Sequence, residues 1–388
     1  MTEAGAHQRD YTIETVHSLL EVPRDEWDRV ANPKGRAFHP FVSWDFLEAM
    51  ERSGSARAET GWQPCHILLR QEDRLCGAMP GYLKGHSQGE YIFDHAFADA
   101  FMRAGGRYYP KFLSAIPFTP ATGPRLLADS AEERGLLLAG ASAVARQMGL
   151  SGANLNFLNA EEAEEAEAAG YALRLGEQYH FEDRGYGSWD GFLSALSSRK
   201  RKALRKERDS LHKEGLEIEW VCGRDIEDRH LDAFWTFYQD TGARKWGTPY
   251  LTRTAFTLLA ERMAERLLFI FAKRGEDFVA GALNVIGGDT LYGRYWGCTE
   301  YVPFLHFELC YYQAIDYALA HGLRRVEAGA QGEHKIARGY EPVATRSAHR
   351  LTDANFHDAV SDYLARERQA VRSDLSMLRE HTPFKKAP

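Results

Sequence analysis

Hydrophobic residues follow two different periods along the chain, and the same order of predicted elements occurs twice. In the first half, apolar residues at helical spacing predict helices at 23–31, 43–52, 131–148 and 160–169. Apolar runs bounded by turn residues predict strands at 65–70, 75–84, 153–158 and 171–182. Residues 86–125 contain many Gly, Pro and aromatic residues and follow neither period. An irregular stretch of this length in a compact domain is more often functional than idle.

The second half repeats this order of elements. Helices are predicted at 189–213, 226–241, 252–266, 305–321 and 353–380, with Gly322 as the cap that ends the fourth helix. Strands are predicted at 215–221, 267–273, 278–286, 290–296, 325–328 and 343–351. No internal sequence repeat is visible, so the duplication rests on element order alone. We predict a mixed α/β fold (α+β mixed sheets) with two domains, at residues 1–184 and 185–388.

Composition narrows the class of protein. The chain has 388 residues, of which 44% are hydrophobic and 27% charged, and this balance is typical of a packed soluble enzyme. A formal charge of −7 argues against a dedicated DNA-binding protein. We find no signal peptide, and the longest apolar run, Leu267–Ala272, is too short to span a membrane. We therefore expect a cytoplasmic location and no membrane insertion.

The cysteines do not form a recognisable framework. They are an odd set with neither a CxxC pair nor metal-type spacing: Cys65, Cys76, Cys222, Cys298 and Cys310. We expect free thiols in a reducing compartment. Cys298 or Cys310 could act as a nucleophile with His306, which lies four residues before Cys310, but a core position on an aromatic helix is the favoured interpretation.

The motifs of several enzyme classes are missing. The chain contains no GxSxG, HExxH, GxxxxGK[ST] or strand-linked GxGxxG, which excludes serine hydrolases, zincins, P-loop proteins and dinucleotide-binding proteins. A basic run at 197–213 carries eight Lys or Arg against two acidic residues. On a helix, Arg201, Arg205 and Arg208 share one face. The run is either a solvated helix face or an anion site for CoA, a nucleotide-linked sugar or a tRNA backbone.

Two glycine-containing segments in the second half are candidate site loops. Arg294-x-x-Gly297-x-Thr299 differs by one residue class from the R/Q-x-x-G-x-G/A phosphate loop of acetyltransferases, although an aromatic core strand fits it as well. We expect Tyr295, Trp296 and His306 to line a pocket there. The second segment, 329–335, carries Glu333, His334 and Lys335, which could supply a general base and electrostatic stabilisation, or form a plain turn.

The irregular stretch of the first half carries another group of polar residues. Asp94, His95 and Asp99 could form a metal or acid/base set, with Lys111 nearby in the sequence. No third-ligand pattern accompanies them, so we predict no metal. A buried hydrogen-bonded network or a wall of a substrate pocket is the favoured interpretation.

Several long stretches, taken together, resemble a bacterial family of predicted N-acyltransferases labelled FemAB-like, or "peptidoglycan biosynthesis/recognition". They are HPFVSWDFLEAMERSG (39–54), GWQPCHILL (61–69), GEYIFDHAFADAF (89–101), YYPKF (108–112), PFTPATGPRLL (117–127), YWGCTEYVPFLHFELCYYQAIDYALAHG (295–322) and EAGAQGEHKIARGYEP (327–342). The resemblance covers about 30–350. It implies two tandem GNAT-like (Gcn5-related N-acetyltransferase) domains, as in Fem-type enzymes that transfer an aminoacyl group from tRNA to an amine.

The resemblance also suggests residue roles. A basic R-x-x-x-R-K segment precedes the second domain of Fem-type enzymes, and 199–208 occupies the like position. Their Phe-Lys…Phe-Gly segment is similar to His334-Lys335…Gly339-Tyr340, which implies a reaction-centre role for Lys335. The Fem-type coiled-coil insertion has no counterpart here, which favours acyl-CoA over aminoacyl-tRNA as the donor.

We therefore predict an N-acyltransferase that acts on an amine, with a cell-wall precursor as one candidate acceptor and no tightly bound cofactor. Glu333 is the expected base, with Lys335 for charge stabilisation and His334 beside them. The expected substrate-binding residues are Arg201, Arg205, Arg294, Tyr295, Trp296, His306, Asp94, His95 and Lys111. Two alternatives remain: a non-catalytic module that binds a cell-wall precursor or nucleotide-linked ligand, and an assembly protein that uses the charged helix 353–380.

Overall fold

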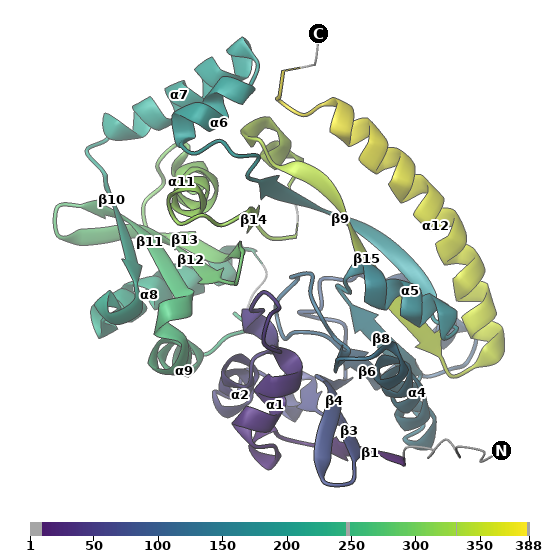
Figure 1. Ribbon diagram of the computed structural model, residues 1–388. Helices are drawn as coiled ribbons and strands as arrows, with labels where there is room; N and C mark the ends of the chain where they lie inside the picture. Colours follow the sequence, from purple (N-terminus) through teal and green to yellow (C-terminus); the bar gives the residue numbers. More distant parts are fainter. Residues whose placement is uncertain (1–9, 246–248, 331, 386–388) are drawn as a thin grey trace, which may run out of the picture.

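A long mixed sheet of 11 strands runs through the molecule, and a sheet of 4 antiparallel strands lies beside it in the N-terminal half (Figure 1). The computed structural model describes residues 10–245, 249–330 and 332–385. The strand order in the large sheet is β10 (Glu217–Cys222), β11 (Leu267–Arg274), β12 (Asp277–Ile286), β13 (Thr290–Cys298), β14 (Arg325–Glu327), β9 (Ala172–Glu182), β15 (Glu341–Leu351), β8 (Gly152–Asn156), β6 (Lys111–Ser114), β5 (Tyr82–Lys84) and β2 (Trp62–Pro64). The small sheet has the order β1 (Tyr11–Val16), β3 (His66–Gln71), β4 (Arg74–Met79) and β7 (Leu127–Ala128).

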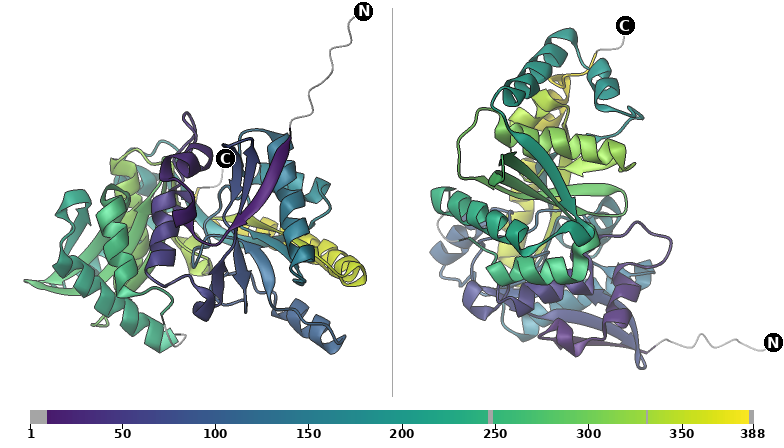
Figure 2. Two further views of the ribbon diagram at one scale, coloured as in Figure 1. Left: turned by 90° about the horizontal axis from the view of Figure 1, so that it is seen from below. Right: turned by 90° about the vertical axis from the view of Figure 1, so that its left-hand side faces the viewer.

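The helices cover both faces of these sheets (Figure 2). They are α1 (Arg24–Ala31), α2 (Trp44–Arg52), α3 (His95–Arg103), α4 (Ala131–Gln147), α5 (Ala160–Ala168), α6 (Trp189–Ala195), α7 (Ser198–His212), α8 (Asp228–Lys245), α9 (Arg253–Met263), α10 (Leu305–Phe307), α11 (Gln313–Ala320) and α12 (Ala354–Glu380). Strand β11 shows how the faces are built. Phe269 and Phe271 pack in the cluster that contains α8 and α9, whereas Leu268 and Ile270 pack in the cluster that contains α11. Alternating side chains of one strand thus enter two cores.

Both halves of the chain use one order of elements. In the first half, β1 is followed by α1, α2, β3, β4, the parallel pair β6 and β8 with α4 between them, and β9. In the second half, β10 is followed by α8, α9, β11, β12, the parallel pair β13 and β14 with α10 and α11 between them, and β15. The mixed α/β fold with two GNAT-like units is therefore confirmed.

The two units exchange their last strands. Strand β9 pairs with β14 of the second unit, whereas β15 pairs with β8 of the first, and β9 and β15 pair with each other from His180 and Glu341 to Ala172 and His349. Figure 1 shows the two strands side by side at the centre of the molecule. The predicted domain boundary after residue 184 falls just beyond β9, and the sheet continues across it. Each half therefore completes the sheet of the other.

Most predicted elements are present within a few residues, but the single helix predicted at 189–213 is wrong. Leu196 is extended and ends α6, and α7 begins at Ser198. The chain end after α12 causes this break: Ser197 N donates to Pro383 O at 2.9 Å, and Leu196 forms a β-bridge with Phe384. The helix predicted at 305–321 is also interrupted, by a π-helical turn at Glu308–Tyr312. The stretch predicted as irregular contains α3 and β6.

Candidate active site

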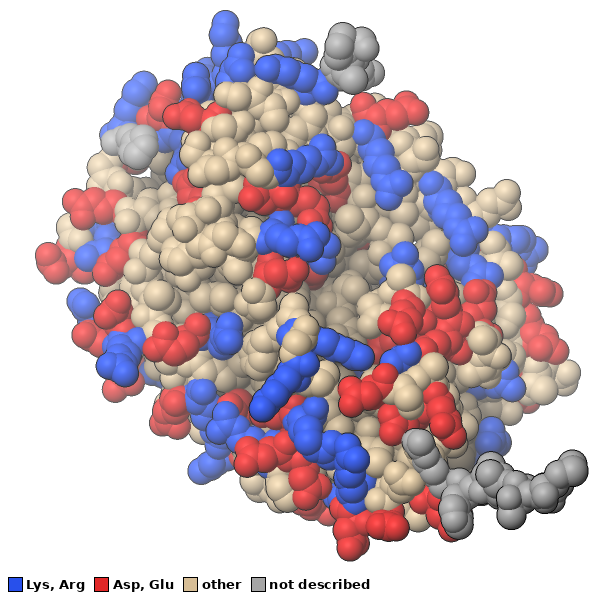
Figure 3. Space-filling model, in the orientation of Figure 1, with Lys and Arg blue, Asp and Glu red and all other residues tan. Residues whose placement is uncertain are grey.

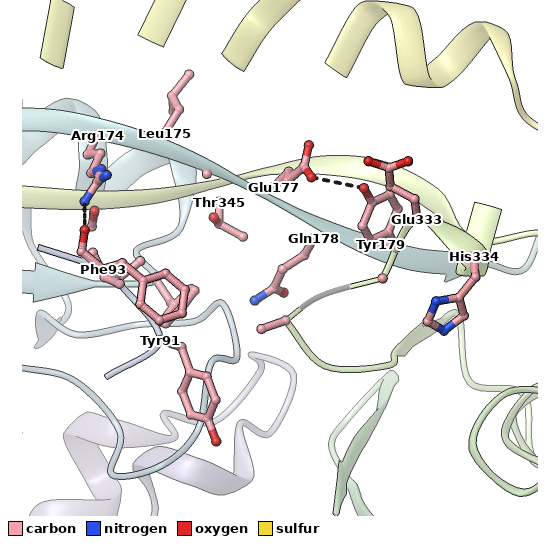
Figure 4. Close-up of a pocket in the computed structure, with 16 residues that line it drawn as sticks. Tyr91, Phe93, Arg174, Leu175, Glu177, Gln178, Tyr179, Glu333, His334 and Thr345 are labelled. Carbon is pink, nitrogen blue, oxygen red and sulfur yellow. Dashed lines mark hydrogen bonds between the residues drawn. The ribbon is translucent and has the colours of Figure 1, made fainter. Parts of the chain in front are cut away.

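A cavity of about 610 Å³ lies against the exchanged strands β9 and β15 (Figure 4). Two loops, at 91–93 and 330–334, close it from the first and second halves of the chain. The polar or ionisable side chains that line it are Arg174, Glu177, Gln178, Tyr179, Glu333, His334, Thr345 and Ser347. Apolar and aromatic walls with a few convergent polar groups are typical of a small-molecule site.

Arg174 ties three parts of the chain together at one end of this cavity. Its Nε and Nη2 donate to the carboxylate of Glu367 on α12, both at 2.8 Å, and its Nη1 donates to Phe93 O at 2.8 Å (Figure 4). The guanidinium also lies 5.4 Å from the centre of the Phe97 ring. A bidentate pair of this kind has a fixed geometry. Arg174 therefore holds the loop 91–93 in place, and Glu367 balances its charge.

The other end of the cavity is acidic. Tyr179 donates its hydroxyl to Glu177 Oε1 at 3.1 Å, and Glu333 lies on the other side of the ring (Figure 4). Burial and the charges of Glu177 and Glu333 raise the pKa of Tyr179 well above its usual value. The phenol stays protonated at neutral pH, and two carboxylates set the charge of this end. Such an arrangement favours a cationic or amine-bearing ligand.

A second, smaller cavity of about 110 Å³ lies in the second unit. Strands β13 and β14 pair in parallel only over Thr290–Tyr292 and Arg325–Glu327. Beyond that point, residues of both segments line the cavity together with β12 and the helical turns at 306–311: Ala282, Leu283, Asn284, Gly293, Arg294, Tyr295, Trp296, His306, Cys310, Tyr311, Ala328 and Gly329. The ring of Trp296 lies 4.8 Å from that of His306. The separation of two parallel strands thus creates a polar and aromatic recess.

The segment 328–334 lies between the two cavities, because its first residues line the small one and its last residues line the large one. His334, on the large cavity, is hydrogen-bonded to the Tyr311 hydroxyl, on the small one, at 2.9 Å. Burial, with Arg338 and Lys335, lowers the pKa of His334. Its imidazole is therefore neutral at pH 7.

Lys335 lies directly behind this segment and is 2% exposed. Its Nζ donates to Gly329 O at 3.0 Å. Burial lowers the pKa of Lys335 to about 8, although a nearby Cys310 acts in the opposite direction. A lysine with such a pKa changes charge close to physiological pH, which is typical of groups at reaction centres.

The glycine-containing segment 294–299 is held by contacts between the two halves. Arg294 Nη2 donates to Phe118 O at 2.6 Å, and the Tyr295 hydroxyl donates to the same oxygen at 3.2 Å. A Cβ on Gly297 would lie 2.1 Å from Phe237 O on α8. Gly297 is therefore required for the close approach of α8. The role of Arg294 at a phosphate stays a prediction.

Asp94 and Lys111 lie in a buried network outside both cavities. Lys111 Nζ donates to Glu90 Oε2 at 2.9 Å, to Ser87 Oγ at 3.0 Å and to Asp94, which also accepts from the Tyr108 hydroxyl at 2.7 Å. Burial alone would lower the pKa of Lys111, but Glu90 and Asp94 raise it to about 12. The lysine stays charged across the physiological range. His95 is exposed at the start of α3.

The basic residues of α7 lie away from the residues that line the two cavities. Arg208 faces inward, where it pairs with Glu308 and Asp316, both at 2.8 Å, and lies over the Trp189 ring. Arg205 is exposed and pairs with Asp190 at 3.1 Å. Figure 3 shows Lys and Arg side chains gathered over α7, whereas acidic side chains gather over α5. The predicted face thus divides into an inward ion pair and an exposed basic surface that includes Arg201 and Arg205.

Sequence reasoning missed the polar residues of the exchanged strands. Arg174, Gln178 and His180 lie at even spacing on β9 and so face one side of the sheet. Their alternation with apolar residues was a usable signal, but it is equally typical of an exposed face. Only the pairing with β15 shows that β9 is central.

Element order and the two adjoining cavities define a mixed α/β protein with two GNAT-like units. The chain belongs to the FemAB-like family, described as peptidoglycan biosynthesis/recognition, whose sequence profile matches residues 18–386. No significant match is found among curated protein sequences. Among residues 10–245, 249–330 and 332–385, no helix is long and apolar enough to cross a membrane.

Solved structures share the fold at low sequence identity. The structure titled FemX is 13% identical, with a TM-score of 0.56 over 90% of this chain and 100% of that one. The L-PGS structure from Bacillus licheniformis is 11% identical, with a TM-score of 0.52 over 86% of this chain and 99% of that one. The C-terminal domain of a putative lysylphosphatidylglycerol synthetase from Agrobacterium fabrum is 11% identical, with a TM-score of 0.53 over 87% of this chain and 96% of that one.

Proposed function

We propose that this protein is an N-acyltransferase that moves an acyl or aminoacyl group from an activated donor to an amine. The observation that supports this proposal most strongly is the pair of cavities on either side of the segment 328–334. Two adjoining sites with titratable groups between them can hold two reactants in contact, and such positioning lowers the barrier of a transfer reaction. The family description and the solved structures titled FemX and L-PGS fit this reading.

The large cavity is the proposed acceptor site. Its acidic end, formed by Glu177 and Glu333 around the Tyr179 hydroxyl, attracts an ammonium group, while the aromatic loop 91–93 covers the remainder of the acceptor. The volume of about 610 Å³ accommodates a molecule the size of a peptide fragment. A cell-wall precursor with a free amine is the acceptor that the family description suggests.

The small cavity is the proposed acyl site. The neutral amine nitrogen attacks the acyl carbonyl carbon, a C–N bond forms, and the bond from that carbon to the carrier sulfur or oxygen breaks. The proton lost by the nitrogen passes through Glu333 and ends on the departing thiol or hydroxyl, so that atoms and charge balance. Lys335 supplies positive charge next to the developing oxyanion, and neutral His334 orients Tyr311.

The exposed surface of α7 is the proposed contact for the phosphates of the donor or of the precursor. Arg201 and Arg205 lie on it with Lys202 and Lys206. Guanidinium groups match phosphate geometry and bind it through paired hydrogen bonds. Acyl-CoA and aminoacyl-tRNA both carry such phosphates, so this surface is compatible with either donor.

The proposal is tested by transfer assays with purified protein. Acetyl-CoA or alanyl-tRNA is incubated with a nucleotide-linked precursor that carries a free amine, and mass spectrometry detects the new amide. We expect one donor to give product and Glu333→Gln to reduce turnover by roughly 100-fold, the lower range for loss of a proton-transfer group. Glu132→Gln, on the exposed first turn of α4, is the matched control and should keep full turnover.

A non-catalytic recognition module is the alternative, and the word "recognition" in the family description favours it. It predicts that the precursor binds saturably while no donor yields an amide. The same assay, combined with calorimetry of precursor binding, separates the two functions.

A further inference from the structure

Asn284 on β12 is a buried amide whose polar atoms are left without partners. The side chain is 1% exposed, and neither Nδ2 nor Oδ1 has a hydrogen-bond partner among the described residues. Buried amides are almost always hydrogen-bonded, because leaving them unpaired costs the folded state the full desolvation of the group. An unpaired amide therefore needs an explanation, and a ligand is the simplest one where the residue lines a cavity, as Asn284 does.

The backbone around Asn284 keeps that space open. Asn284 pairs across the sheet with Gly293, next to a register shift between Leu283 and Asn284. A Cβ on Gly293 would lie 3.4 Å from Asn284 Oδ1. With glycine there, no side chain of β13 covers the amide at this position.

Two backbone irregularities lie on the opposite wall. The π-helical turn at Glu308–Tyr312 supplies Cys310 and Tyr311 to the cavity. Just before it, Phe304 has a positive φ of 67°, which is strained for a residue with a side chain. Turns of this kind and local strain persist mainly where a site requires them. Together with the unpaired amide, they indicate a built pocket.

We propose that Asn284 binds the acyl group of the donor, which rests on the proposed function. Its Nδ2–H donates to the acyl carbonyl oxygen, and its Oδ1 accepts from an N–H or O–H on the neighbouring α-carbon. The volume of about 110 Å³ corresponds to roughly four water-sized groups, so the acyl chain is short. The transferred group is therefore a small acyl group with an α-amino or α-hydroxyl substituent. A plain acyl chain would leave Oδ1 unpaired.

The experiment compares three small amides that differ at one atom: alaninamide, lactamide and propanamide. Their affinities for the wild-type protein and for Asn284→Leu are measured by ligand-observed NMR titration. Wild-type protein should bind alaninamide or lactamide at least about tenfold more tightly than propanamide, and this preference should fall to about one in Asn284→Leu. Whichever of the two binds identifies the α-substituent as amino or hydroxyl.

Controls keep the proposal open to refutation. Asn156→Leu alters another buried, unpaired amide, on β8 outside the residues that line the small cavity, and should leave the preference unchanged. If Asn284→Leu does not fold, Asn284→Ala, which adds no bulk, replaces it. Equal binding of the three amides to wild-type protein, or an unchanged preference in the Asn284 variants, overturns the proposal. Failure of all donors in the transfer assay would instead reject the proposed function, since amide binding is measured without turnover.

Discussion

The parallel strand pairs of the two units have the same topology and opposite contents. In the first unit, the chain beyond β6 continues into Ala115, Ile116 and Phe118, which are all buried in the core that both halves share. In the second unit, the chain beyond the paired part of β13 lines a cavity with Asn284 beneath it. One arrangement of strands therefore serves as packing in one unit and as a candidate binding site in the other. What fills the gap between the strands, and not the topology, decides between these roles.

The largest effect is expected from emptying the filled gap. Phe118 is 2% exposed and packs against the rings of Trp62 and Tyr250. Phe118→Ala should lower the free energy of unfolding by about 3–5 kcal/mol, because a cavity replaces an aromatic ring. Urea denaturation measures this loss. Asn284→Leu provides the contrast, because it removes an unpaired amide and should leave stability unchanged or higher; equal losses for both variants would erase the distinction between the two units.

Lys335 should matter for turnover and little for stability. Lys335→Met removes charge stabilisation next to the small cavity, and we expect turnover to fall by about 10²–10³-fold, as for a lost oxyanion partner. Because the lysine pKa is about 8, the charged form is lost as pH rises through that value, and the wild-type pH–rate profile should fall there. The profile of Lys335→Met should lack this decline. A variant with wild-type turnover would remove Lys335 from the site.

Glu327, at the end of β14, gives a pH-dependent prediction. Burial, opposed by Arg325 and Arg294, raises the pKa of Glu327 to about 8. The protonated form is the one that the fold favours, so wild-type stability should decrease as pH rises from about 4.5 to about 8, by at most about 1.4 kcal/mol per pH unit. Glu327→Gln should weaken this dependence and be relatively more stable at pH 8. Thermal melts at pH 5 and pH 8 measure it, with Glu132→Gln as an exposed control.

The smallest effect is expected on the exposed surface of α7. Arg205 makes only an exposed ion pair with Asp190, so Arg205→Gln should change stability by less than about 0.5 kcal/mol. Binding of the donor should weaken severalfold, and more strongly at low salt, since exposed charges are screened. Titrations at two salt concentrations test this. Unaltered donor affinity at low salt would mean that α7 is only a solvated face.

The contrast between the two units also shows what the sequence could reveal. Helical and strand periods are local, and they predicted α1, α4, β11 and β12 closely. The break between α6 and α7 could not be foreseen, because it depends on Pro383 and Phe384, far away in the chain. Of the site, polar residues on loops such as Glu333 and His334 were found, because glycines flank them. Asn284 and Gln178 lie in strands, and their roles depend on pairings that no local pattern encodes.

The claim that the second unit, and not the first, holds the acyl group is tested most directly by a crystal structure with a non-transferable donor. An acyl-CoA thioether and an amide-linked aminoacyl adenosine are suitable analogues for the two candidate carriers. The account predicts acyl density between β13 and β14, next to Asn284 and Trp296, with the carrier leading toward solvent. Density between β6 and β8, or an acyl group bound only in the large cavity, would contradict it.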